Sequence, residues 1–152
     1  MSLKLKFDGK SVDWNEVVNI LIESGMPHRS PEVHKRAFYM SHPVLFVYSD
    51  NKLVGFGRAI SDGEYQAAIY DVAVLPSYQR KGIGKLIVSK IIDMCPNCDF
   101  ILFASNGSER FYEKLNFKSN NTGMILSAGD LNPAATHVHD SLSDHTEVNT
   151  QS

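Results

Sequence analysis

The residues best suited to chemistry lie in a short polar loop, Gln79-Arg80-Lys81-Gly82-Ile83-Gly84. The loop follows an apolar run that ends at Pro76 and precedes a segment with a helical apolar period. The first backbone N–H groups of a helix lack partners within the helix and carry partial positive charge, so an anion is stabilised there. Glycine has no Cβ atom to keep a bulky phosphate away from these groups.

Cationic side chains surround the same loop. Arg80 and Lys81 precede the first glycine, and Lys85 follows the second. Guanidinium and ammonium groups bind phosphate oxygens through charge-assisted hydrogen bonds. The sequence therefore predicts a strand, a phosphate loop (residues 79–84) and a helix, with a pocket for a pyrophosphate.

Two common phosphate motifs do not fit the loop. The dinucleotide fingerprint requires a third glycine where Ile87 stands, and the loop does not continue into the Gly-Lys-Ser/Thr of a P-loop. The spacing instead resembles the coenzyme A loop of the GNAT family of N-acetyltransferases, Gln/Arg-x-x-Gly-x-Gly/Ala after a strand. Gln79, Gly82 and Gly84 occupy the patterned positions. A glycine-rich turn without a ligand is the alternative for the loop taken alone.

A second stretch, residues 104–117, resembles the GNAT segment Phe-Tyr-x-Lys-x-Gly-Phe. Asn116 replaces the usual glycine, a mild departure because asparagine tolerates the left-handed geometry of a helix end. The resemblance covers roughly residues 44–126 and, more weakly, the two predicted helices before them. A narrower and weaker resemblance points to the plastid and cyanobacterial branch, which acetylates arylalkylamines and protein lysines.

The resemblance implies acetyl-CoA as cosubstrate and a function of moving its acetyl group to a primary amine. A lysine or N-terminal amine of a protein is an alternative acceptor, and a non-catalytic CoA-binding regulator is an alternative function. Backbone groups on the strand before the loop would pair with the pantetheine arm. The residues expected to bind the cosubstrate are Val72, Ala73, Val74, Gln79, Arg80, Lys81, Gly82, Ile83, Gly84, Lys85 and Asn106.

Tyr112 and Asp71 are the expected catalytic residues. By the resemblance, Tyr112 protonates the departing thiolate, with packing against the cosubstrate as its alternative role. The base is less defined, because Ala68 stands where some GNAT enzymes have a glutamate. Asp71 is preferred to Glu64 because it lies beside the expected acetyl position, and an ion pair is its alternative role. The expected mechanism is direct attack, with the N–H of Val72 or a neighbour stabilising the oxyanion.

The order of predicted elements indicates an α+β fold of the GNAT type. A half-buried strand (residues 1–7) is followed by a helix from the Asp13 cap to Gly25 and a second helix from Pro31. Three strands joined by tight turns follow. The phosphate loop, its helix and an apolar run, predicted to be a fully buried strand, come next. We expect a mixed, mostly antiparallel sheet with a splayed parallel pair, flanked by about four helices.

Length and composition bound the remaining possibilities. The 152 residues, with 43% hydrophobic and 21% charged, suit one domain at 1–127 and a polar tail at 128–152. The net charge of −2 gives no overall attraction to nucleic acid or anionic membranes. A homodimer wrapped by the tail is left open. The tail's His137, His139 and His145 are interpreted as solvated, so no metal is expected.

The two cysteines form a single Cys-Pro-Asn-Cys, Cys95 to Cys98. A redox pair or half a zinc site is an alternative, but no second cysteine pair exists. The preferred interpretation is two structural thiols in a reducing cytoplasm. Both are expected to lie away from the cleft, which disfavours a covalent acyl-cysteine route.

Overall fold

The computed structural model describes residues 1–131 of the chain. Within these residues the strands are β1 (Leu3–Lys6), β2 (Val44–Ser49), β3 (Lys52–Ser61), β4 (Gln66–Val74) and β5 (Asp99–Ile101). The helices are α1 (Trp14–Glu23), α2 (Pro31–Tyr39), α3 (Ile83–Asp93), α4 (Glu109–Glu113) and α5 (Ala128–Leu131), with a 3-10 turn, η1, at Pro76–Tyr78.

The strands form one mixed sheet in the order β1-β2-β3-β4-β5. Each pair is antiparallel except β4 and β5, which run parallel. β5 pairs only with the first residues of β4, Gln66 to Ala68, and β4 continues to Val74 without it. The expected mixed sheet with a splayed parallel pair is therefore confirmed.

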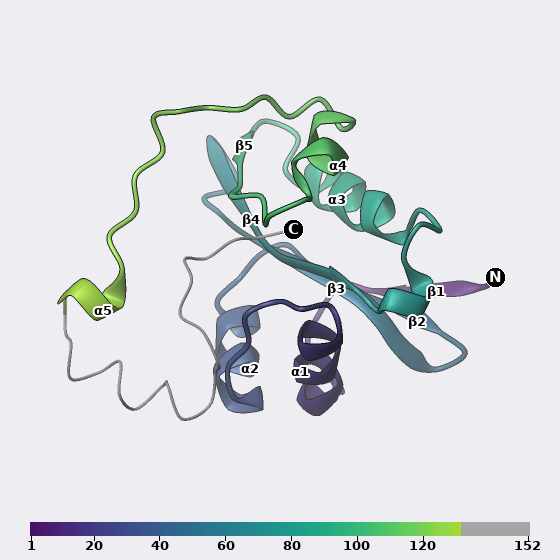
Figure 1. Ribbon diagram of the computed structural model, residues 1–152. Coiled ribbons are helices and arrows are strands. Elements are labelled where there is room, and N and C mark those ends of the chain that lie inside the picture. Colours follow the sequence, from purple (N-terminus) through teal and green to yellow (C-terminus); the bar gives the residue numbers. More distant parts are fainter. Residues whose placement is uncertain (132–152) are drawn as a thin grey trace.

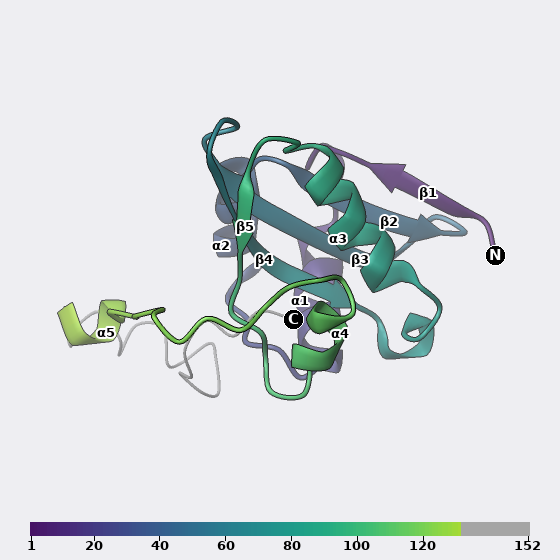
Figure 2. The ribbon, with the colours of Figure 1, turned by 90° about the horizontal axis from the view of Figure 1, so that it is seen from above.

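Helices cover both faces of the sheet. Figure 1 shows α1 and α2 on one face and α3 and α4 on the other, and Figure 2 shows α3 crossing the strands. On the α1 and α2 face, rings from both layers pack with centroids 5.2 to 6.5 Å apart. The aromatic residues of this cluster are Trp14, Phe38, Phe46 and Phe56.

Two glycines of β3 allow α3 to approach the sheet. A Cβ atom on Gly57 would lie 2.6 Å from Cγ2 of Ile87, and one on Gly55 would lie 3.2 Å from Cδ1 of the same residue. Both glycines therefore lie where α3 approaches the sheet closely, and Gly57 also lies opposite a β-bulge of β4.

The predicted start and end of α1 and the predicted start of α2 are confirmed. The carboxylate of Asp13 accepts a hydrogen bond of 2.9 Å from the backbone N–H of Asn15. Gly25 follows the helix with a φ of +70°. Pro31 opens α2, and its N-cap Ser30 makes no side-chain capping bond. Sequence signals of this kind act locally, so tertiary packing does not displace them.

The prediction of a fully buried strand after α3 is wrong. Only Asp99 to Ile101 form β5, and the side chain of Ile101 is 57% exposed. Among the described residues β5 is the last strand of the sheet, so one of its edges has no strand beside it. An apolar run alone does not distinguish a central strand from an edge strand.

The segment after α4 leaves the body of the fold. Figures 1 and 2 show it passing across the α4 side to α5, which lies apart from the sheet. Most of the predicted tail, with His137, His139 and His145, lies outside the described residues. In residues 1–131, no helix is long and apolar enough to cross a membrane, and no three metal-ligating side chains of the His, Cys, Asp and Glu types gather.

Candidate active site

A pocket of about 650 Å³ opens between the end of β4, the start of α3 and the α4 region. Its walls combine small, apolar and cationic residues. The lining residues are Val72, Val74, Gln79, Arg80, Gly82, Gly84, Lys85, Gly107, Ser108, Phe111, Lys114 and Leu115.

Seven of the predicted cosubstrate-binding residues line this pocket, namely Val72, Val74, Gln79, Arg80, Gly82, Gly84 and Lys85. Four others do not. Ala73 and Ile83 are buried in the core, and Asn106 lies exposed in a turn. The ammonium group of Lys81 lies over the ring of Tyr78, 5.3 Å from its centroid.

The backbone of the phosphate loop is shaped for an anion. Arg80 and Gly82 both have left-handed φ values, +61° and +83°, and Gly82 is the N-cap of α3. Such turns bring successive N–H groups to one concave side, where they bind anions. A non-glycine residue with positive φ is uncommon, so Arg80 holds a conformation that the surrounding loop must stabilise.

The side chain of Gln79 fixes the loop to the strand before it. Its amide Nε2 donates to the carbonyl oxygen of Val74 at 2.9 Å, and the hydroxyl of Ser24 donates to the same oxygen at 3.1 Å. A carbonyl oxygen has two lone pairs, and both are used here. A pantetheine amide that pairs with β4 would therefore use backbone groups other than this carbonyl.

The charge of the pocket is positive. Arg80, Lys85 and Lys114 line it, and none of its lining residues is acidic. Each cation can make a charge-assisted hydrogen bond to a phosphate oxygen. This arrangement suits a ligand with several phosphate charges.

Sequence reasoning pointed to Asn106 and Tyr112 in this stretch but missed the residues around α4 that line the wall, Phe111, Lys114 and Leu115. Phe111 belongs to α4, and Lys114 and Leu115 follow directly after its last residue, three and four positions from Phe111, so the three lie on one side of this short helical stretch. This spacing was the available signal. A Cβ on Gly84 would lie 3.4 Å from Cζ of Phe111, so the glycine of the loop also lets this ring pack closely.

Tyr112, the predicted acid, is held tightly on the same short helix. Its ring packs edge-on against Phe111 and Phe117, with centroids 4.9 and 5.7 Å away. The residue is 2% exposed, and its buried hydroxyl has no hydrogen-bond partner. Burial raises the pKa of this phenol above its ordinary value, so the hydroxyl keeps its proton. A buried donor without a partner fits a site completed by a bound ligand.

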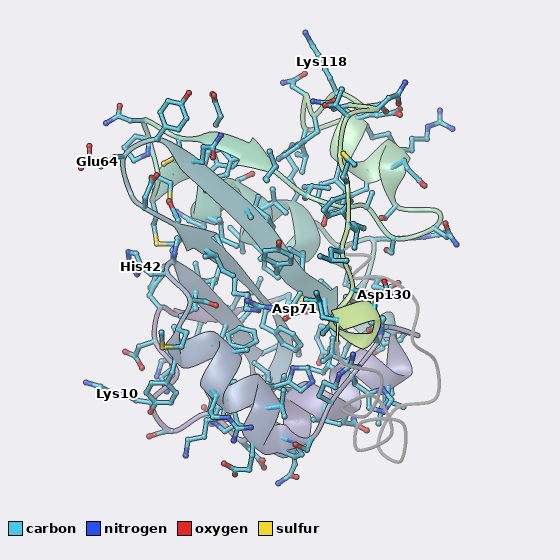
Figure 3. The ribbon with its side chains drawn as sticks, turned by 90° about the vertical axis from the view of Figure 1, so that its left-hand side faces the viewer. Lys10, His42, Glu64, Asp71, Lys118 and Asp130 are labelled. Carbon is cyan, nitrogen blue, oxygen red and sulfur yellow. The ribbon has the colours of Figure 1, made fainter. Side chains whose placement is uncertain are left out.

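Asp71 lies outside the pocket lining, on the neighbouring part of β4. Its carboxylate Oδ2 accepts a hydrogen bond of 2.7 Å from Nε of Arg58. Figure 3 shows Asp71 in the interior and Glu64 at the far end of the sheet. Glu64 belongs to the exposed β3–β4 turn, so it does not share a site with Asp71.

The two thiols lie at the connection between α3 and β5. Cys95 is buried and Cys98 is half-buried, with its sulfur 3.6 Å from the hydroxyl of Ser61. Neither sulfur lines the pocket. This placement agrees with the expectation that the cysteines take no part in acyl transfer.

A buried histidine lies near Asp71 on the α2 side. His34 is 6% exposed, and its Nε2 accepts a hydrogen bond of 2.8 Å from the backbone N–H of Arg29. Burial, more than any other cause, lowers the pKa of His34, and the charges of Arg58 and Arg29 lower it further. The charge of Asp71 opposes this shift. The neutral imidazole therefore fixes the loop between α1 and α2.

Stability should depend on pH through His34. The unfolded chain takes up a proton near pH 6.5 that the folded state resists, so the free energy of unfolding should fall as the pH drops below about 6.5. The loss should end once the pH lies below the lowered pKa of the folded state. Thermal melts of the wild type and His34→Gln between about pH 5 and 7.5 test this, because glutamine can accept the same hydrogen bond without titrating. Equal slopes for both proteins would contradict the prediction.

Comparison with known proteins gives the chain its relatives. The family described as "Acetyltransferase (GNAT) family" matches residues 14–117. A chloroplastic GCN5-related N-acetyltransferase 3 of Arabidopsis thaliana is 55% identical over 51 residues, 34% of this chain and 22% of that protein. The histone acetyltransferase TAP1 of Glycine max is 30% identical over 130 residues, 76% of this chain and 56% of that protein. The chain thus spans between about a fifth and just over half of these relatives.

A solved structure supports the same assignment. A probable acetyltransferase of unknown function from meticillin-resistant Staphylococcus aureus superposes with a TM-score of 0.74 and 25% identity. The superposition covers 83% of this chain and 99% of that one. The splayed sheet, the phosphate loop at the start of α3 and the tyrosine of α4 therefore occur in a chain that belongs to the GNAT family of acetyltransferases.

Proposed function

We propose that this chain transfers an acetyl group from acetyl-CoA to a primary amine by direct attack of the amine on the thioester. The observation that carries the proposal is the buried hydroxyl of Tyr112, which lacks a partner and lies on the helix that also walls a cationic pocket. A proton donor held beside a phosphate-binding pocket is what the departure of a coenzyme A thiolate requires.

Different residues of the chain have different roles in the proposed reaction. Arg80, Lys85 and Lys114 bind the phosphates, and the turns at Arg80 and Gly82 add backbone N–H groups. Acetyl-CoA, when bound, supplies the acetyl group as an activated thioester. Tyr112 holds a proton at its Oη for the leaving sulfur. The amine attacks in its neutral form, its C–N bond forms as the C–S bond breaks, and the proton that its nitrogen loses replaces, through solvent, the one that Tyr112 gives to the sulfur.

The proposed acceptor is a small amine or a lysine side chain. Support for a protein acceptor comes from the histone acetyltransferase named among the relatives. Several relatives are named as chloroplastic, so we propose a plastid compartment in place of the cytoplasm expected from the sequence. Neither nucleic acid nor a membrane is proposed as a partner, and a homodimer remains a proposal for measurement in solution.

The first test is a thermal melt with acetyl-CoA, CoA and NAD in parallel. A ligand that binds only the folded state raises stability by about 2.7 kcal/mol at one hundred times its Kd. Acetyl-CoA and CoA should raise the melting temperature and NAD should not. Lys85→Ala should weaken CoA binding about tenfold or more, because it removes a charge-assisted bond at the pocket. Lys90→Ala, at the other end of α3, is the matched control.

The second test follows thiol release from acetyl-CoA across a panel of primary amines and a lysine peptide. Release that depends on the amine supports the enzyme. CoA binding without release for any amine favours the regulator, and the absence of a melting shift with either CoA form would mean that the phosphate loop has been misinterpreted.

A further inference from the structure

We propose that Arg58 is a positioning residue for acetyl transfer, because it fixes the bulge of β4 at Asp71 and with it the adjoining wall of the pocket. The inference rests on the proposed function and assigns Asp71 a task other than that of a base. It follows from the pairing of β3 with β4, the conformation of Asp71, its ion pair with Arg58 and the place of Val72 in the pocket.

The first observation is an interruption in the pairing of β3 and β4. Phe56 pairs with Ala73, but Arg58 pairs with Tyr70, so two residues of β4 stand opposite the single residue Gly57. Such an insertion is a β-bulge, which bends the strand and redirects the side chains and backbone groups beyond it. The bulge lies where β4 has already parted from β5.

The second observation is the conformation at the bulge. Asp71 has a φ of +53°, which is uncommon for any residue other than glycine. Aspartate tolerates this region better than most residues, yet such a conformation persists only where its surroundings determine it. Something must therefore hold Asp71 in place.

The third observation identifies what holds it. Nε of Arg58 donates to Oδ2 of Asp71 at 2.7 Å, and the two side chains are only 14% and 15% exposed. Nη1 of Arg58 donates to the hydroxyl of Ser41 at 3.1 Å. That hydroxyl in turn donates to the carbonyl of Ala37, at 2.7 Å, near the end of α2.

Two aromatic rings also contact the guanidinium group of Arg58. Its carbon lies 5.8 Å from the ring centroid of Phe38 and 5.1 Å from that of Tyr70. Arg58 is thus fixed by charge, by a hydrogen bond to α2 and by contacts on its flat faces. A half-buried pair anchored in this way has little of the freedom that makes surface ion pairs weak.

The fourth observation connects the pair to the pocket. The residue directly after Asp71 is Val72, which lines the pocket that we assign to acetyl-CoA. The peptide bond between Asp71 and Val72 cannot move unless the bulge moves with it. Because a displacement of about 1 Å can lower a rate a hundredfold, the ion pair acts on the reaction through the backbone that it fixes.

The test compares matched variants of the full chain. Arg58→Lys keeps the positive charge but loses the planar guanidinium group, whose Nε and Nη1 bind Asp71 and Ser41 at the same time. Asp71→Gly accepts the left-handed φ but has no carboxylate, whereas Asp71→Asn accepts the same φ and keeps an oxygen for Arg58. Lys6→Gln, which removes the exposed 3.9 Å pair with Asp8, is the control.

We expect Arg58→Lys and Asp71→Gly to lower kcat by about 10- to 100-fold, with KM for acetyl-CoA within about twofold of the wild type. Asp71→Asn should keep kcat within about threefold, and Lys6→Gln should match the wild type. Rates are measured well below the melting temperature of each variant, so that a loss of folded protein does not lower the measured kcat. A structural role alone would lower the melting temperature and leave kcat unchanged.

Two results would overturn the inference while the proposed function stands. One is unchanged kcat in Arg58→Lys and Asp71→Gly. The other is a loss in Asp71→Asn as large as that in Asp71→Gly, together with a changed pH profile, since the carboxylate would then act chemically. A wild-type chain that binds CoA but acetylates no amine would overturn the proposed function and this inference with it.

Discussion

Tyr112→Phe is expected to make the protein more stable and the reaction slower. The hydroxyl is buried without a partner, and an unsatisfied buried group costs about 1 to 3 kcal/mol. Its removal should therefore raise the free energy of unfolding of the unliganded chain by about 1 kcal/mol. A positioned proton donor contributes about 10²- to 10⁴-fold in rate, so kcat should fall by at least about 100-fold.

The two effects are separated by measuring urea unfolding without ligand and kcat with saturating acetyl-CoA. Tyr48→Phe is the matched control, because Tyr48 is a partly buried tyrosine on β2, whereas Tyr112 lies on α4 directly after the pocket residue Phe111. It should leave kcat unchanged. Because burial raises the pKa of Tyr112, ionisation of this phenol should not reduce the rate below about pH 10. If Tyr112→Phe keeps kcat within about threefold, the ring only packs at the site.

Gly57→Ala is expected to destabilise the fold by about 1 to 3 kcal/mol, because the new methyl group would overpack the layer between β3 and α3. The added Cβ atom would lie 2.6 Å from Cγ2 of Ile87 and 3.3 Å from Cδ1 of Ile91. Both isoleucines are fully buried, so neither can move aside without shifting α3. The shift in the urea midpoint at unchanged m-value measures this cost.

Gly63→Asn provides the comparison for Gly57→Ala. Gly63 lies in the β3–β4 turn with a φ of +77°, and no atom lies within 4 Å of an added Cβ. Asparagine accepts that conformation, so the free energy of unfolding should change by no more than about 0.5 kcal/mol. Equal urea midpoints for Gly57→Ala and the wild type would show that α3 is not in close contact with β3.

The phosphate loop could be predicted because its signals are local. Paired glycines, cations and the start of a helical period all lie within residues 79–85, and local signals survive folding. The α4 wall was only partly predicted. The family pattern drew attention to Asn106 and Tyr112, whereas the helix face places Phe111, Lys114 and Leu115 at the pocket.

The bulge and the edge strand could not be predicted in the same way. The Arg58–Asp71 pair joins residues thirteen positions apart, across a shift in register whose signal in the sequence, Gly57 within β3, is equally consistent with a close approach of another element. The exposure of Ile101 depends on which elements lie beside β5, and an apolar run in the sequence does not indicate this. Features set by the pairing of distant segments therefore required the structure.

The carbonyl oxygen of Val74 links two distant segments and so affects how this chain can evolve. The carbonyl of Val74 receives hydrogen bonds from Ser24, at the end of α1, and from Gln79, in the phosphate loop. Gln79 lines the pocket proposed for acetyl-CoA, whereas α1, which ends directly before Ser24, covers the face of the sheet opposite α3. A lineage that loses the hydroxyl at residue 24 would disturb the carbonyl that anchors residue 79 as well. The end of α1 and the phosphate loop are thus tied together in the inheritance of this chain, and mutations at the two positions should be selected as a pair.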